Sequence, residues 1–136
     1  MANRSYFGTL EGLAAGRHRA RQRERLPVLP ALFGRALIST LDPTRQMRVK
    51  TARVFEPTSS SVDTQILAAF AQQQARLIEL MRACAGLDAE RIIITSPAEP
   101  FVTYSLLDAF RIIVVHEQHH LIGAARLLAT PGFPPT

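Results

Sequence analysis

The sequence has few of the features that mark disulfide-linked, membrane-spanning or secreted proteins. Its single cysteine, Cys84, cannot form an internal disulfide, which fits a reducing compartment. No run reaches the roughly 18 uncharged apolar residues that a membrane-spanning helix needs. The N-terminus has no apolar segment of the kind found in secretory signals. We therefore expect a cytoplasmic protein without a membrane segment.

The chain has little net charge outside the N-terminus. The formal net charge is +5, but residues 1–26 contain six arginines and only two glutamates, so the remainder is nearly neutral. No aromatic residues alternate with the arginines of residues 17–25, as base stacking would require. We expect this basic segment to be solvated and partly disordered, and we do not expect the protein to bind nucleic acid.

The length and the 47% hydrophobic content predict a single domain over residues 1–136.

Helical patterns dominate the rest of the chain. A helix is expected from Pro30 to Thr40, because proline is tolerated only in the first turn of a helix. Apolar residues recur every three or four positions from the predicted cap Asp63 to Gly86. A last helix, capped by Thr103 or Ser105, should run to about residue 129.

Residues 92–94 are isoleucines that could form a strand, but Pro97 and Pro100 follow so closely that we expect a loop. The sequence contains no internal repeats and no glycine-rich phosphate loop. The predicted fold class is therefore all-α, an up-and-down helical bundle with a long crossover connection.

Cys84 lies on the apolar side of its helix, and we interpret it as a core residue rather than a nucleophile.

Three of the four histidines fall within five residues of the last predicted helix. His116 and His120 are one turn apart and differ by about 40° around the helix axis, so both rings can reach one metal ion. Neutral imidazole is a good ligand for zinc, nickel, copper or iron. His119 lies on the flank, where it could line the site. The alternative without a metal is that these histidines are hydrogen-bonded to other groups or exposed to solvent.

A two-histidine site is incomplete, because catalytic zinc typically has three protein ligands. The remaining histidine in the chain is His18. His116, Glu117 and His120 formally match the HExxH pattern, but no third ligand of that type follows within the last 16 residues. Glu117 could instead act as an outer hydrogen-bond acceptor.

Residues 103–128, TYSLLDAFRIIVVHEQHHLIGAARLL, resemble the last helix of the DinB/YfiT-like four-helix-bundle family. Residues 50–81 resemble its crossover and third helix, and the resemblance extends over about residues 41–129. It implies a three-histidine site for a divalent metal, with the first histidine on the second helix. His116 and His120 match the family's metal-binding pair, and His18 is the candidate for the first ligand. Zinc or nickel is the expected metal.

The resemblance further implies a homodimer and a metal-dependent thiol transferase or hydrolase that acts on a small-molecule thiol or electrophile. The N-terminus departs from the family pattern, and two explanations stay open. Either part of the first helix is missing, or the second helix starts near Pro30 and carries no ligand. A different class of function is a non-catalytic oligomerising interaction module.

Overall fold

The computed structural model describes residues 2–25, 29–41 and 65–133. These residues form four α-helices, two short 3-10 helices and one two-stranded antiparallel sheet. In chain order the elements are η1 (Ala2–Tyr6), α1 (Phe7–Ala14), η2 (Gln22–Arg25), α2 (Leu29–Leu41), α3 (Ile66–Ala83), β1 (Ile93–Thr95), β2 (Thr103–Ser105) and α4 (Leu106–Leu128). The all-α fold class is confirmed, with a small hairpin added to it.

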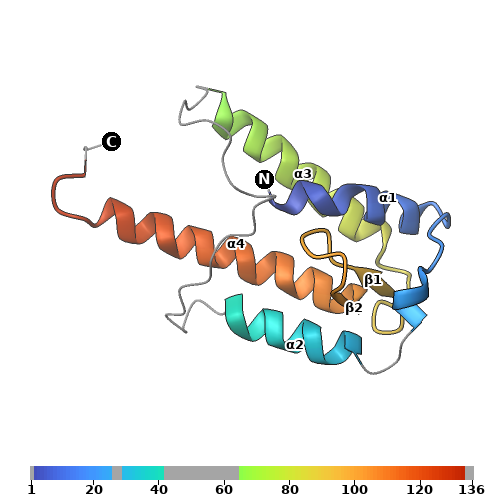
Figure 1. Cartoon of the computed structure of the whole chain (residues 1–136). Coiled ribbons are helices and arrows are strands. Elements are labelled where there is room, and N and C mark those ends of the chain that lie inside the picture. Colours follow the sequence, from blue (N-terminus) through green and yellow to red (C-terminus); the bar gives the residue numbers. More distant parts are fainter. Residues whose placement is uncertain (1, 26–28, 42–64, 134–136) are drawn as a thin grey trace.

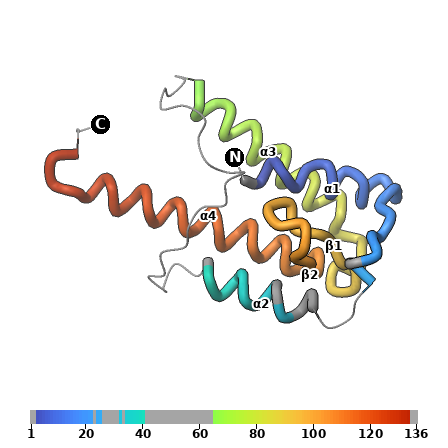
Figure 2. Tube along the Cα trace, in the orientation of Figure 1, coloured from blue at the N-terminus to red at the C-terminus, as the bar shows by residue number. Residues whose placement is uncertain are grey.

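Helix α4 runs through the middle of the molecule. Helix α2 packs along its first half, and α1 and α3 pack against each other on the opposite side (Figure 1). The β1–β2 hairpin lies beside the N-terminal end of α4. The second half of α4 extends beyond α2, as the trace in Figure 2 shows. No helix in the described ranges is both long enough and apolar enough to cross a bilayer.

The start of α4 has the predicted cap. Ser105 is in an extended conformation, and its Oγ accepts a hydrogen bond from the backbone N–H of Asp108 at 3.0 Å. The cap satisfies one of the N–H groups that have no partner within the helix. The helix ends at Leu128, before a turn in which Gly132 has a φ of 86°. The helices expected near residue 30 and before Gly86 are also present, whereas Asp63 lies outside the described residues.

The isoleucine segment forms a strand, so the predicted loop is wrong. Ile94 pairs with Tyr104, and both side chains are completely buried. The N–H of Leu106 also donates to the carbonyl of Ile92 at 2.8 Å, which continues the pairing into the first turn of α4. Pro97 and Pro100 lie in the connection between the strands, where they interrupt no ladder hydrogen bond.

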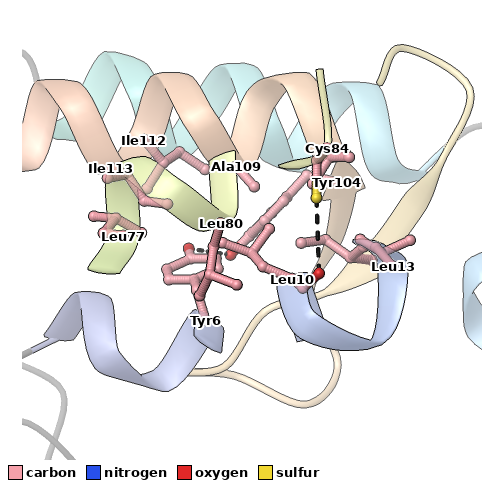
Figure 3. Close-up of a cluster of buried hydrophobic side chains, with 12 residues drawn as sticks. Tyr6, Leu10, Leu13, Leu77, Leu80, Cys84, Tyr104, Ala109, Ile112 and Ile113 are labelled. Carbon is pink, nitrogen blue, oxygen red and sulfur yellow. Dashed lines mark hydrogen bonds between the residues drawn. The ribbon is translucent and has the colours of Figure 1, made fainter. Parts of the chain in front are cut away.

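The hydrophobic core lies between α1, α3, β2 and the first half of α4 (Figure 3). Cys84 is buried in it with its Sγ 3.7 Å from the carbonyl oxygen of Leu10, which agrees with its interpretation as a core residue. The buried apolar residues are Tyr6, Leu10, Leu13, Leu77, Leu80, Cys84, Ile94, Tyr104, Leu106, Ala109, Ile112 and Ile113.

The N-terminal segment is therefore part of the fold, which corrects the expectation that residues 1–26 are partly disordered. Tyr6, Leu10 and Leu13 contribute to the core. Further along, the carboxylate of Glu24 is buried and accepts hydrogen bonds from the N–H of Arg21 at 2.7 Å and from the Thr95 hydroxyl at 2.8 Å. One acid within the arginine run thus attaches η2 to β1.

Candidate metal centre

His116 and His120 lie side by side on the second half of α4. Their Nε2 atoms are 3.0 Å apart, and their ring centroids are 4.4 Å apart with an interplanar angle of 85°. The one-turn spacing on a continuous helix accounts for this proximity. The two Nε2 atoms thus lie within hydrogen-bonding distance of each other.

The distance between the two nitrogens is suitable for two atoms that bind the same metal ion. Two Zn–N bonds of about 2.05 Å to atoms 3.0 Å apart enclose an angle of about 95° at the metal. This angle is close to that of adjacent positions in octahedral coordination and somewhat smaller than the tetrahedral angle. The separation of the two nitrogens is thus compatible with binding to one divalent ion.

The electrostatic environment favours the neutral, ligating form of His116. Its side chain is half-buried, and burial is the main cause that lowers the pKa of His116 below its ordinary value. The charge of nearby His120 lowers this pKa further. His120 itself is exposed. Burial thus favours the neutral form of one histidine of the pair, and the other histidine is exposed to solvent.

An N-terminal residue reaches the same region of α4. Asn3 is buried in η1, and its side-chain amide donates a hydrogen bond to the carboxylate of Glu117. Glu117 is half-buried and directly follows His116. Sequence reasoning missed Asn3, because a single asparagine far from α4 in the chain belongs to no motif or periodic pattern. This contact attaches η1 to α4 beside the histidine pair.

His119 is exposed, and its ring centroid is 6.0 Å from that of His120. This position at the edge of the pair agrees with the flanking place that the helical spacing predicts.

The structure does not bring His18 to the pair. His18 Nε2 lies 3.4 Å from Glu24 Oε2, in the segment that packs on the hairpin. The hairpin adjoins the start of α4, and His116 lies about 15 Å further along that helix. Within the described ranges, no group of three or more His, Cys, Asp or Glu side chains is arranged to hold a metal ion. The ligand set His116, His120 and His18 is therefore not assembled here.

Helix α2 packs on α4, as a second bundle helix should, yet its residues 29–41 include no histidine. This arrangement corresponds to the explanation in which the second helix starts near Pro30 and carries no ligand. The short helix α1 precedes it and contributes Leu10 and Leu13 to the core.

Together, these elements define a helical bundle with two adjacent histidines on its last helix. The family model of the DinB superfamily matches residues 31–122, which is more than half of the chain. The chain therefore belongs to the DinB superfamily. The matched region extends from α2 into α4 and includes both His116 and His120. Comparisons with curated proteins and with solved structures found no match.

Proposed function

We propose that this protein binds a divalent metal ion through the Nε2 atoms of His116 and His120. The observation that carries the proposal is their 3.0 Å separation on one face of α4. Zinc and nickel are the preferred candidates, because both bind imidazole nitrogen well. Membership of the DinB superfamily supports this proposal, because the last-helix histidine pair resembles the family's metal-binding pair.

The proposed chemistry is that of a metal-dependent thiol transferase or hydrolase. A bound divalent metal supplies Lewis acidity, which lowers the pKa of a coordinated water or thiol. Two protein ligands leave several coordination positions open, and the exposure of His120 gives a small molecule access to them. The chain itself keeps His116 neutral through burial and holds the adjacent Glu117 through Asn3.

Metal binding can be tested on tag-free protein by calorimetric titration with zinc and with nickel. We expect one ion per chain, and loss of this stoichiometric binding in His116→Ala and in His120→Ala. His119→Ala is the matched control, because it removes an exposed histidine from the same turn of helix. The proposal fails if the wild-type protein takes up neither metal, or if His119→Ala weakens binding as much as the other two.

The same titration on His18→Gln addresses the third ligand. The position of His18 beside Glu24 predicts unchanged affinity in this variant. A large loss of affinity would mean that His18 reaches the metal in a different arrangement of the N-terminal segment.

A second proposal, that the protein is a homodimer acting as an interaction module, is favoured by the surface of α4. Leu121, Leu127 and Leu128 are each more than half exposed. Residues 118–133 include one charged residue, Arg126, so two copies of this segment would face little repulsion between like charges. A second copy of the chain would cover these apolar side chains in a symmetric contact.

Sedimentation at micromolar concentration tests the homodimer. We expect a dimer for the wild-type protein and a shift toward monomer for the double variant Leu121→Gln, Leu128→Gln. The variants His116→Ala and His120→Ala should sediment like the wild type. A wild-type monomer at this concentration would contradict the proposal and leave the metal proposal intact.

A further inference from the structure

A groove of about 580 Å³ lies between the N-terminal helical segment and α3. It is large enough for a small organic ligand. Its lining contains no histidine and shares no residue with the candidate metal centre. The lining residues are Arg4, Phe7, Ala69, Gln72, Gln73, Ala75, Arg76 and Glu79.

The two arginines of the groove differ in their partners. Arg76 forms ion pairs with Glu11 of α1 at 2.9 Å and with Glu79 at 3.3 Å. Arg4 is exposed and has no ion pair or side-chain hydrogen bond with any other residue in the described ranges. The guanidinium of Arg4 is therefore available to an anion, whereas the charge of Arg76 is already compensated.

Gln73 also lines the groove, next to Gln72 on the same helix. Its Nε2 atom has no exposed surface and no hydrogen-bond partner among the residues that the structure describes, so a ligand in the groove would not reach that atom. The charged group that the groove offers to a ligand is therefore the guanidinium of Arg4.

The rest of the lining is largely apolar. Phe7 contributes from α1, and Ala69 and Ala75 contribute small side chains from α3. These residues suit the hydrocarbon part of a ligand and leave room for it. The carboxylate of Glu79 at the same groove disfavours a ligand with a second negative charge.

We propose that this groove binds a small monocarboxylate with an apolar body. The carboxylate pairs with the Arg4 guanidinium, while the hydrocarbon packs against Phe7 and the alanines of α3. A carboxylate fits the planar guanidinium fork well, and charge-assisted hydrogen bonds of this kind are strong. The proposal does not depend on metal binding by His116 and His120.

The test uses full-length, metal-free protein and calorimetric titration with octanoate, phenylpropionate and benzoate, each compared with its neutral amide. We expect at least one carboxylate to bind with one-to-one stoichiometry at millimolar or lower concentration. The matching amide should bind about tenfold more weakly, because it cannot form the charged contact. Failure of all three carboxylates to bind would overturn the proposal.

Variants locate the binding site. Arg4→Gln should weaken carboxylate binding about tenfold and leave amide binding nearly unchanged. Arg82→Gln is the matched control, because it removes an equal charge from an exposed position of α3 outside the groove. Equal losses in both variants would indicate nonspecific attraction and overturn the proposal. Loss of binding in His116→Ala would place the carboxylate at the histidine pair instead and would also overturn it.

Discussion

The hydroxyl oxygens of Tyr6 and Tyr104 lie 2.6 Å apart inside the core. The two side chains come from η1 and from β2, at opposite ends of the sequence (Figure 3). Burial raises the pKa of Tyr6 above its ordinary value of 10.0, and it also raises the pKa of Tyr104. This contact joins the N-terminal segment to the hairpin beside α4.

Tyr6→Phe should lower the free energy of unfolding by about 1 kcal/mol, the typical contribution of one hydrogen bond. The ring remains and keeps its packing, while the Tyr104 hydroxyl retains its interaction with Ser96. Urea denaturation of Tyr6→Phe, Tyr104→Phe and the double variant gives the coupling between the hydroxyls. A coupling energy near zero would mean that the two groups do not interact in solution.

Alkaline pH should destabilise the protein through the same pair. Because the pKa of each tyrosine is raised in the folded state, the two neutral hydroxyls make their full contribution to the free energy of unfolding below pH 10, the ordinary tyrosine value. This contribution is lost as the pH rises above that value. The chain has two tyrosines and no tryptophan, so phenolate absorbance reports these two side chains alone. We expect this absorbance to rise together with loss of helical circular dichroism. Ionisation of both tyrosines near pH 10 in a fully helical protein would contradict the prediction.

Local patterns made α4 and its histidine pair predictable. The cap at Ser105 and the one-turn spacing of His116 and His120 depend on residues a few positions apart, and the structure contains both contacts. The hairpin was missed because three-residue strands show no period and Pro97 and Pro100 suggested a loop. The pairing that buries Ile94 and Tyr104 depends on the fold rather than on local sequence.

Long-range contacts account for the other differences. Glu24 lies in an arginine run that is typical of a solvated surface, yet its carboxylate binds the hydroxyl of Thr95 on a distant strand. The contact between Asn3 and Glu117 joins residues separated by 114 positions. For the same reason the position of His18 could not be derived, because its partner Glu24 is fixed by the packing of η2 on the hairpin.

Gly34→Ala should destabilise the packing of α2 on α4. A Cβ atom at Gly34 would lie 2.5 Å from Oδ2 and 2.9 Å from Cγ of Asp108, closer than van der Waals contact allows. We expect a loss of about 1–3 kcal/mol, as for other overpacked sites. Gly12→Ala in α1 is the control, because an added Cβ meets nothing within 4 Å there and should stabilise the helix slightly. Equal effects of the two substitutions in urea denaturation would rule out this close contact.

Ser105→Ala should lower the free energy of unfolding by about 1 kcal/mol through loss of the cap on α4. The Ser105 hydroxyl accepts a hydrogen bond from the N–H of Asp108, and alanine cannot replace it. Ser105→Thr keeps an oxygen at this position and should retain most of the stability. Thermal denaturation of both variants gives the comparison, and an alanine variant as stable as the threonine variant would show that the cap contributes nothing.

The pKa of His116 should respond to its neighbours in a definite order. Burial is the largest cause of its lowered pKa, and the charge of His120 is the second. His120→Gln should therefore raise the pKa of His116 in the metal-free protein but leave it below 6.5, because burial persists. His119→Gln should raise it less, since His119 contributes the smallest of the causes. Nuclear magnetic resonance titration of the imidazole protons measures these shifts in a chain with four histidines. A larger rise in His119→Gln than in His120→Gln would contradict the geometry that brings the two Nε2 atoms together.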